Sequence, residues 1–385
     1  MTRPVITLLL VSLFWAGCRE ALAPAPPERA ATLPTDARPS EPSRLPHYGI
    51  EIIDSHVHIV PSITALAVAL EVLEGAGIKL FVAKSGGAYG TPRFWSTVAM
   101  KRVLGERFEF FCNIDWDGID DPEFAKRTAL GLEQAAAAGA KGVKIFKALG
   151  LQVKTADGKL VTVDDPRLDP IFDKAGELGL MMAMHTADPV AFFEPPTPDN
   201  ERYEELSIAG RWSFYGEDFP SHDELLAQRD RRLARHPQTK FLLIHLANYP
   251  ENLEYVDKLL DTYPNVWVDT SARVPEFGRH AADKVRAFFI KHQDRILFGS
   301  DIVVSNRGLQ LGSVADEPPT TADGIRFYER HFEFFETDHL QMEHPTPIQG
   351  RWKVDAISLP PEVLRKLYHD NAWKLIYEAK VVGQN

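Results

Sequence analysis

Eight short apolar runs recur between residues 49 and 301, and longer stretches with helical periodicity separate them. The runs are GIEIID (49–54), IKLFVAK (78–84), FEFFCNID (108–115), GVKIFKA (142–148), LMMAMHT (180–186), FLLIHLA (241–247), NVWVDTS (265–271) and RILFGSD (295–301). Intervening stretches such as PEFAKRTALGLEQAAAAGA and NLEYVDKLLDTY carry apolar residues three and four positions apart, as amphipathic helices do. This alternation predicts repeated βα units around a parallel sheet.

Two architectures share this alternation, the closed TIM barrel and the doubly wound open sheet. Polar residues at the ends of the runs favour the barrel, because only a barrel brings the first and eighth strands together. They are Asp54, His56, His58, Lys144, Lys147, His185, His245, Asp269, Arg273 and Asp301. Chemistry in barrel enzymes collects at the C-terminal strand ends. We therefore predict an α/β fold, a (β/α)8 TIM barrel over residues 49–380.

Two segments depart from a minimal barrel. Residues 187–221, after the fifth predicted strand, form an unusually long connection rich in aromatic, proline and acidic residues. A loop of this length in a compact domain usually serves a function. We expect a long insertion here, either a lid over the barrel mouth or a subunit contact in a homo-oligomer. The C-terminal stretch LPPEVLRKLYHDNAWKLIYEAK predicts closing helices.

Composition narrows the class of partner. The chain has 385 residues, of which 44% are hydrophobic, as in folded globular proteins. Its formal net charge of −11 argues against a nucleic-acid surface, because phosphate binding needs clustered Lys and Arg. Only Cys18 and Cys112 are present, so the sequence holds neither a disulfide framework nor a cysteine-rich metal site. We expect a small-molecule substrate.

The N-terminus predicts export. Residues 1–17, MTRPVITLLLVSLFWAG, place one arginine before a short apolar run, the layout of a secretory signal peptide. The following Cys18 resembles the lipidated cysteine of a bacterial lipobox, although Trp15 stands where leucine is usual; ordinary signal cleavage is the alternative. Residues 18–48 are rich in Pro and Ala and predict a tether. We expect an exported, membrane-anchored lipoprotein facing the periplasm or cell exterior.

The stretch IIDSHVHIV, residues 52 to 60, places polar residues at alternating positions of an apolar run. In a strand, residues two apart point to the same face, so Asp54, His56 and His58 would share one space. That arrangement suits a metal site. A core strand whose histidines are satisfied by hydrogen bonds is the alternative.

Several short motifs together resemble the amidohydrolase superfamily. They are DSHVHI at the first predicted strand, MHTADP at the fifth, LIHLAN at the sixth, VWVDTSA at the seventh, ILFGSDI at the eighth and LYHDNAWKLI near the end. Within the superfamily, the chain looks closest to the group that includes metal-dependent hydrolases and carboxymuconate-semialdehyde-type decarboxylases. The resemblance covers about residues 50 to 380 and implies a metal-dependent enzyme on a barrel.

The resemblance implies a metal site made of His56, His58, His185 and Asp301. Three imidazoles and one carboxylate suit zinc, with one ion per chain. Asp301 would also act as general base, and His245 would polarise the substrate or, in a binuclear site, bind a second metal. Lys144 is the candidate bridge between two metals, and a solvated or ion-paired lysine is the alternative.

Three functions remain open at this stage. The first is a hydrolase that directs a metal-activated water at an ester, lactone or amide. The second is a metal-dependent lyase, a decarboxylase or hydratase of an unsaturated acid, with Arg273 as an anchor for the substrate carboxylate. The third is a binding lipoprotein without catalysis. The sequence does not separate the first two, because a fold and its ligands do not fix the reaction.

Overall fold

The computed structural model describes residues 47–216 and 218–384. The predicted signal segment, Cys18 and the tether up to residue 46 lie outside the described residues and stay predictions. His47 and Tyr48, which the sequence assigns to the tether, belong to the described fold, where the ring of His47 contacts Glu336 at 2.6 Å. Within the described ranges, no helix is both long and apolar enough to cross a bilayer.

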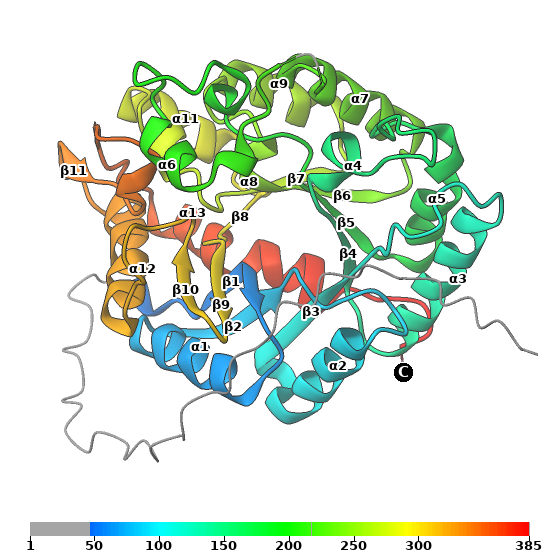
Figure 1. Cartoon of the computed structure of the whole chain (residues 1–385). Coiled ribbons are helices and arrows are strands. Elements are labelled where there is room, and N and C mark those ends of the chain that lie inside the picture. Colours follow the sequence, from blue (N-terminus) through cyan, green and yellow to red (C-terminus); the bar gives the residue numbers. More distant parts are fainter. Residues whose placement is uncertain (1–46, 217, 385) are drawn as a thin grey trace, which may run out of the picture. The chain divides into compact units, whose positions relative to one another are not determined.

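A ten-stranded sheet forms the centre of the fold (Figure 1). Its strands are β1 (Ile52–Ile59), β2 (Ile78–Ala83), β3 (Phe108–Asn113), β4 (Gly142–Ile145), β5 (Met181–Met184), β6 (Lys240–Leu243), β7 (Val266–Asp269), β8 (Ile296–Leu297), β9 (Ile302–Ser305) and β10 (Gly308–Leu311). The order is β10-β9-β1-β2-β3-β4-β5-β6-β7-β8, and every pair except β9–β10 is parallel. The predicted parallel α/β sheet is therefore confirmed.

The sheet curls so that its first and last parallel strands meet. β1 pairs with β9, which follows β8 after only four residues. Between them, the N–H of Ser55 donates to the carbonyl of Phe298 and the N–H of Asp301 donates to the carbonyl of His56. Gly299 permits this approach, because a Cβ there would lie 2.8 Å from the Cβ of His56.

Helices surround the sheet (Figure 1). They are α1 (Ile63–Gly75), α2 (Pro92–Leu104), α3 (Phe124–Ala137), α4 (Ala148–Leu151), α5 (Asp169–Leu178), α6 (Tyr203–Ile208), α7 (His222–Arg235), α8 (Ile244–Ala247), α9 (Leu253–Thr262), α10 (Val274–Phe277), α11 (Ala282–Lys291), α12 (Thr321–Glu336) and α13 (Pro361–Arg365). A short hairpin pairs β11 (Met342–Glu343) with β12 (Lys353–Val354). Between β5 and α7, the chain carries α6 and two 3-10 turns, Val190–Phe193 and Gly210–Trp212.

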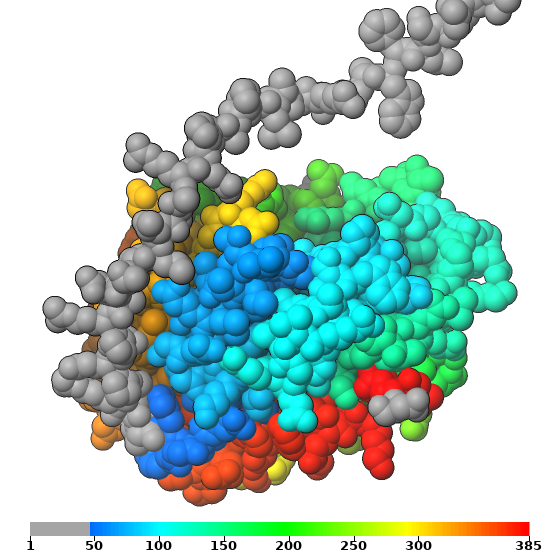
Figure 2. All heavy atoms as spheres, turned by 90° about the horizontal axis from the view of Figure 1, so that it is seen from below, coloured from blue at the N-terminus to red at the C-terminus, as the bar shows by residue number. Residues whose placement is uncertain are grey.

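The C-terminal segment packs against the interior of the curled sheet. After α13 it continues as the π-helical turns Lys366–Asp370 and Trp373–Tyr377. Its Ala372, Leu375 and Ile376 join a buried apolar cluster with inward-facing strand residues such as Ile53 and Leu242. In Figure 2 this segment, coloured red, lies along one end of the folded body. That end of the sheet is filled with apolar side chains, which leaves the opposite end for polar residues.

The strands are shorter than the apolar runs that predict them. The sixth run extends to residue 247, but β6 ends at Leu243, and His245 through Asn248 all have positive φ. The eighth run extends to residue 301, but β8 contains only Ile296 and Leu297. The hairpin of β9 and β10 is absent from the sequence-based prediction. These early strand ends place His245 and Asp301 in connections rather than in strands.

Candidate metal centre and active site

β1 carries two histidines whose side chains reach the same space. The Nε2 atoms of His56 and His58 lie 3.2 Å apart. Asp54, expected to face the same space, instead accepts hydrogen bonds from Ser300 Oγ at 2.5 Å and Tyr328 Oη at 2.7 Å. An irregular register between Asp54 and Val57 interrupts the pairing of β1 with β2 and accounts for this difference. Asp54 therefore ties β1 to the connection between β8 and β9 and to α12, rather than joining the histidines.

Asp301 completes a group of three candidate ligands. Its Oδ1 lies 3.4 Å from Nε2 of His56 and 3.2 Å from Nε2 of His58. Two ligand atoms in a tetrahedral zinc site lie about 3.3 Å apart, given Zn–N distances of about 2.0–2.1 Å. Nδ1 of His56 donates to Oδ2 of Asp269 at 2.8 Å, which leaves the Nε2 lone pair free for a metal. The spacing and the tautomer both fit a divalent metal.

His185 and His245 form a second pair. Nε2 of His185 donates to Asp188 at 3.0 Å, and Nδ1 of His245 donates to the carbonyl of Ser271 at 2.8 Å. The two remaining nitrogens, Nδ1 of His185 and Nε2 of His245, face each other at 3.2 Å. Both carry lone pairs in the neutral rings, so a cation between them would relieve their repulsion. Among the described residues, the close group of candidate ligands contains His56, His58 and Asp301. The ring of His185 instead contacts His245 and Asp188.

Burial keeps the four imidazoles neutral. It lowers the pKa of His185 to about 4 and that of His58 below its ordinary value. Burial, with the charge of Lys144, holds the pKa of His56 well below its ordinary value; burial and Arg273 do the same for the pKa of His245. A metal needs neutral imidazole nitrogens. The site therefore presents ligands in the protonation state that metal binding requires.

Lys144 lies on β4 and is only 1% exposed. Among the described residues, no carboxylate lies within 4.0 Å of its ammonium group. Burial lowers its pKa to about 8, although Asp301 and Asp269 act in the opposite direction. Lys144 lines the pocket described below. It is therefore neither the solvated nor the ion-paired lysine that the sequence left as an alternative.

Two candidate site residues adopt strained backbone conformations. His245 has φ 57° and Asp301 has φ 64°. A side chain other than glycine in this region costs about 1–2 kcal/mol. Asp269 offsets part of the cost at His245, because its Oδ1 accepts the backbone N–H at 2.9 Å. Strain of this kind concentrates at functional sites.

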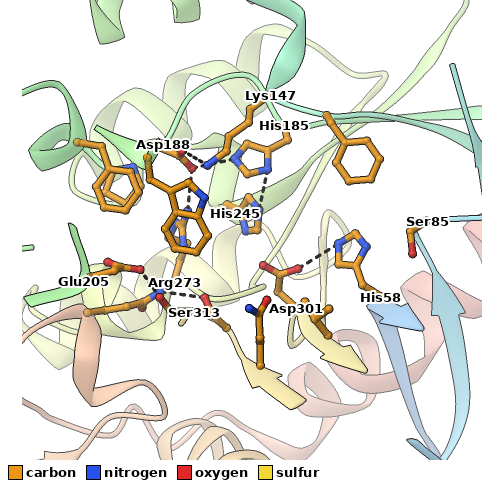
Figure 3. A pocket seen from close by; sticks show the side chains of 18 of the residues that line it. His58, Ser85, Lys147, His185, Asp188, Glu205, His245, Arg273, Asp301 and Ser313 are labelled. Carbon is orange, nitrogen blue, oxygen red and sulfur yellow. Dashed lines mark hydrogen bonds and ion pairs between the residues drawn. The ribbon is translucent and has the colours of Figure 1, made fainter. Parts of the chain in front are cut away.

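These residues open into a pocket of about 400 Å³ at the C-terminal ends of the strands (Figure 3). Its lining includes His58, Lys144, His185, His245, Arg273 and Asp301. Phe146, Phe192 and Trp212 supply aromatic surface, and Trp212 comes from the long connection after β5. The volume suits a small molecule.

Asp188 holds several pocket groups in place. Its carboxylate contacts Lys147 and His185, and Arg273 lies 3.8 Å away. Burial opposes ionisation of Asp188, but these neighbours outweigh it and hold the pKa of the carboxylate below its ordinary value. Arg273 donates through Nη1 to the carbonyl of Ala272 and lines the pocket.

Sequence reasoning identified seven pocket or ligand residues and missed others. The structure gathers His56, His58 and Asp301 as one group, and places His185, His245, Lys144 and Arg273 around the same pocket. Sequence reasoning did not identify Asp188, although a carboxylate shortly after a barrel strand is a readable signal. It also missed Lys84, which is fully buried over the ring of Phe111 and does not line the pocket.

Comparison with known proteins agrees with this geometry. The amidohydrolase family profile matches residues 53–376. The chain belongs to the amidohydrolase family. An uncharacterized TIM-barrel protein from Bordetella bronchiseptica is similar in fold to this amidohydrolase, with 16% identity and a TM-score of 0.52 over 86% of this chain and 99% of that one.

Two further solved structures resemble the amidohydrolase more weakly. One is 2,6-dihydroxybenzoate decarboxylase from Rhizobium, with 16% identity and a TM-score of 0.46 over 85% of this chain and 98% of that one. The other is dihydroorotase from Campylobacter jejuni, with 11% identity and a TM-score of 0.46 over 86% of this chain and 85% of that one. No curated protein matches the chain.

Proposed function

We propose that this amidohydrolase is a metal-dependent hydrolase that cleaves an ester, lactone or amide bond of a small molecule. The observation that carries the proposal is the spacing of His56, His58 and Asp301, whose ligand atoms lie 3.2–3.4 Å apart at the base of the pocket. Nitrogen and carboxylate ligands of this kind suit zinc. When bound, the metal supplies a Lewis acid that makes water a nucleophile near neutral pH.

The chain's own residues supply the rest of the chemistry. Asp301 accepts the proton of the attacking water and delivers it to the leaving group. Nearby His56, His58 and Lys144 outweigh burial and hold the pKa of Asp301 below its ordinary value, so the carboxylate is ionised and ready to accept. Arg273 binds a carboxylate of the substrate through its planar guanidinium.

His245 has two candidate roles. As a general acid it would polarise the substrate oxygen, but Nε2 must then carry a proton. The hydrogen bond from Nδ1 to Ser271 leaves a lone pair on Nε2, which favours metal binding. We propose that His185 and His245 hold a second ion when Lys144 carries a carboxyl group, and a single ion with His185 as its fourth ligand is the alternative.

A lyase is the second candidate function. The same metal and the same Asp301 would serve decarboxylation or hydration of an unsaturated acid, and Arg273 would hold its carboxylate. A binding protein without catalysis is the weakest candidate, because none of the candidate ligands is missing from the site.

The decisive experiment is an assay of the purified, zinc-loaded full chain. Panels of esters, lactones and amides are compared with β-keto and enoic acids, and hydrolysis products and released carbon dioxide are measured separately. Hydrolysis that is lost on chelation and regained with zinc supports the proposal. Carbon dioxide release or hydration without hydrolysis would replace it with the lyase.

A matched pair of variants tests whether the pocket performs the reaction. His58→Ala should lower turnover by about a hundredfold or more, since it removes a ligand. His339→Ala changes an exposed histidine and should leave turnover unchanged. Turnover that survives in the His58 variant contradicts the assignment of the site.

A further inference from the structure

The pocket carries more cationic than anionic side chains, although the chain as a whole has a net charge of −11. Its cations are Arg93, Lys144, Lys147, Arg202 and Arg273, and its carboxylates are Asp188, Glu205 and Asp301. Lys147 pairs with Asp188, and Arg202 pairs with Glu205 at 2.6 Å. Among the described residues, Arg93 has no carboxylate partner, and Arg273 has only the longer contact of 3.8 Å with Asp188, which Lys147 also contacts.

Arg93 is fixed by hydrogen bonds that leave part of it free. It lies in the first turn of α2, and its Nε and Nη2 donate to the carbonyl and hydroxyl of Ser85 at 2.7 and 3.1 Å. Among residues 47–216 and 218–384, no carboxylate lies within 4.0 Å of Arg93, and Nη1 makes no hydrogen bond. A guanidinium held in this way can bind a carboxylate without first losing rotamer freedom.

The position of Arg93 runs against helix electrostatics. The first turn of α2 contains no acidic residue, and the helix dipole disfavours a cation at this position. Residues that break such a local rule are expected at functional positions. Arg93 lines the pocket together with Ser85 and His58.

Arg273 lies on the other side of the candidate metal ligands. In Figure 3, Arg273 and Ser85 lie at opposite sides of the view, and Asp301 and His58 lie between them. Arg273 is 5% exposed, and its Nη2, which makes no hydrogen bond, lies 3.8 Å from Asp188. The pocket therefore offers one available guanidinium on each side of the metal ligands.

We propose that the substrate is a small dicarboxylate, with one carboxylate on Arg273, the other on Arg93 and the reacting group between them. The aromatic surfaces of Phe146, Phe192 and Trp212 favour a planar or unsaturated carbon skeleton. This inference rests on the proposed function only in taking the same pocket as the substrate site, and it applies to a hydrolase or a lyase.

The test measures binding rather than turnover, so it can fail independently of the proposed reaction. Dissociation constants of phthalate, isophthalate, terephthalate and benzoate are measured by calorimetry on the zinc-loaded full chain. The three diacids place the second carboxylate at different distances from the first, and benzoate lacks it. At least one diacid should bind about three- to tenfold more tightly than benzoate, as expected for an added charge-assisted contact at a partly exposed site.

Variants assign the gain to Arg93. Arg93→Gln should bring the affinity for that diacid to the benzoate level and leave benzoate binding unchanged, and Arg93→Lys should restore part of the gain. Arg102→Gln makes the same charge change on α2, at an exposed position that does not line the pocket. The Arg102→Gln variant should still bind the diacid more tightly than benzoate.

Two outcomes overturn the proposal. One is a chain that binds none of the diacids more tightly than benzoate. The other is an Arg93→Gln variant that weakens benzoate and diacid equally, which would indicate a structural role. Diacid binding without hydrolysis of any ester, lactone or amide would reject the proposed hydrolase and support the dicarboxylate site. Hydrolysis of neutral substrates without diacid binding would support the hydrolase and reject the dicarboxylate site.

Discussion

Nδ1 of His56 lies 2.8 Å from Oδ2 of Asp269, and both side chains are fully buried. The other carboxylate oxygen of Asp269 accepts the hydroxyl of Ser271 at 2.5 Å and the backbone N–H of His245 at 2.9 Å. One carboxylate on β7 thus orients a ligand on β1 and shapes the turn that carries His245. Asp269 therefore positions a histidine in each of the two groups, His56 in one and His245 in the other.

Replacing Asp269 should weaken metal binding without unfolding the chain. Asp269→Asn keeps the shape of the side chain but removes the charge that fixes the His56 tautomer. Loss of such a partner typically lowers metal affinity about 10- to 100-fold. Competition with a fluorescent chelator measures the change. Asp338→Asn, at an exposed position, serves as the control, and equal affinities in all three proteins would contradict the role of Asp269.

The sequence predicts the parts of the fold that depend on periodicity. Eight apolar runs correspond to β1–β8 in order, and the strand-end positions of His56, His58 and Asp301 predict their convergence. It does not predict how soon each strand ends. His245 leaves β6 because four successive residues turn into the left-handed region, and that conformation depends on Asp269, which is distant in sequence.

Contacts between distant segments explain the other omissions. The β9–β10 hairpin is stabilised by the pairing of β9 with β1. No local pattern in residues 302–311 predicts this pairing with a strand so distant in sequence. Asp54 alternates with His56 in the sequence but bonds to Ser300 and Tyr328, which come from the other end of the chain. Arg93 joins the pocket through Ser85, although neither residue stands in a motif.

The metal content should depend on bicarbonate. A neutral amine at Lys144 adds carbon dioxide to form a carbamate and releases a proton, and burial that lowers the Lys144 pKa to about 8 increases the neutral fraction. Zinc reconstitution should give about one ion per chain without bicarbonate and about two with it, since the carbamate would complete a second ligand set. Elemental analysis counts the ions, and intact mass detects the carbamate.

Variants at lysine positions separate this mechanism from adventitious binding. Lys144→Met should hold a single ion under both conditions. Lys258→Met alters an exposed lysine and should behave as wild type. If wild type holds one ion under both conditions, without added mass on Lys144, the two-ion proposal is rejected. The alternative, a single ion with His185 as its fourth ligand, would then stand.

Adding a methyl group at Gly299 should disturb the junction between β1 and the end of β8. The new Cβ would lie 2.8 Å from the Cβ of His56, so a strand must move. Overpacking of this kind costs about 1–3 kcal/mol, and zinc affinity should fall because His56 moves with β1. Gly210→Ala, where no atom lies within 4 Å, is the matched control for urea unfolding and chelator competition. Unchanged stability and affinity in Gly299→Ala would show that the junction is not tightly packed.

The stability of the fold should decrease in acid partly because of His331. This residue on α12 is 1% exposed, packs against Phe298 and Phe327, and has its pKa lowered by burial to about 4. The unfolded chain takes up a proton near pH 6.5, whereas the folded chain resists it down to about pH 4. The contribution of His331 to stability is therefore complete above pH 6.5 and is lost as the pH falls toward 4. Between pH 7 and pH 5 the loss is about 2 kcal/mol.

Substitution of His331 should flatten this dependence. His331→Phe has no group to protonate, so its free energy of unfolding should fall by about 2 kcal/mol less than that of wild type between pH 7 and pH 5. Urea unfolding of metal-free proteins at both pH values measures the difference and keeps metal dissociation out of the comparison. His339→Phe alters an exposed histidine nearby in the sequence and should retain the wild-type dependence. Parallel pH profiles for wild type and His331→Phe would show that burial of His331 does not limit acid stability.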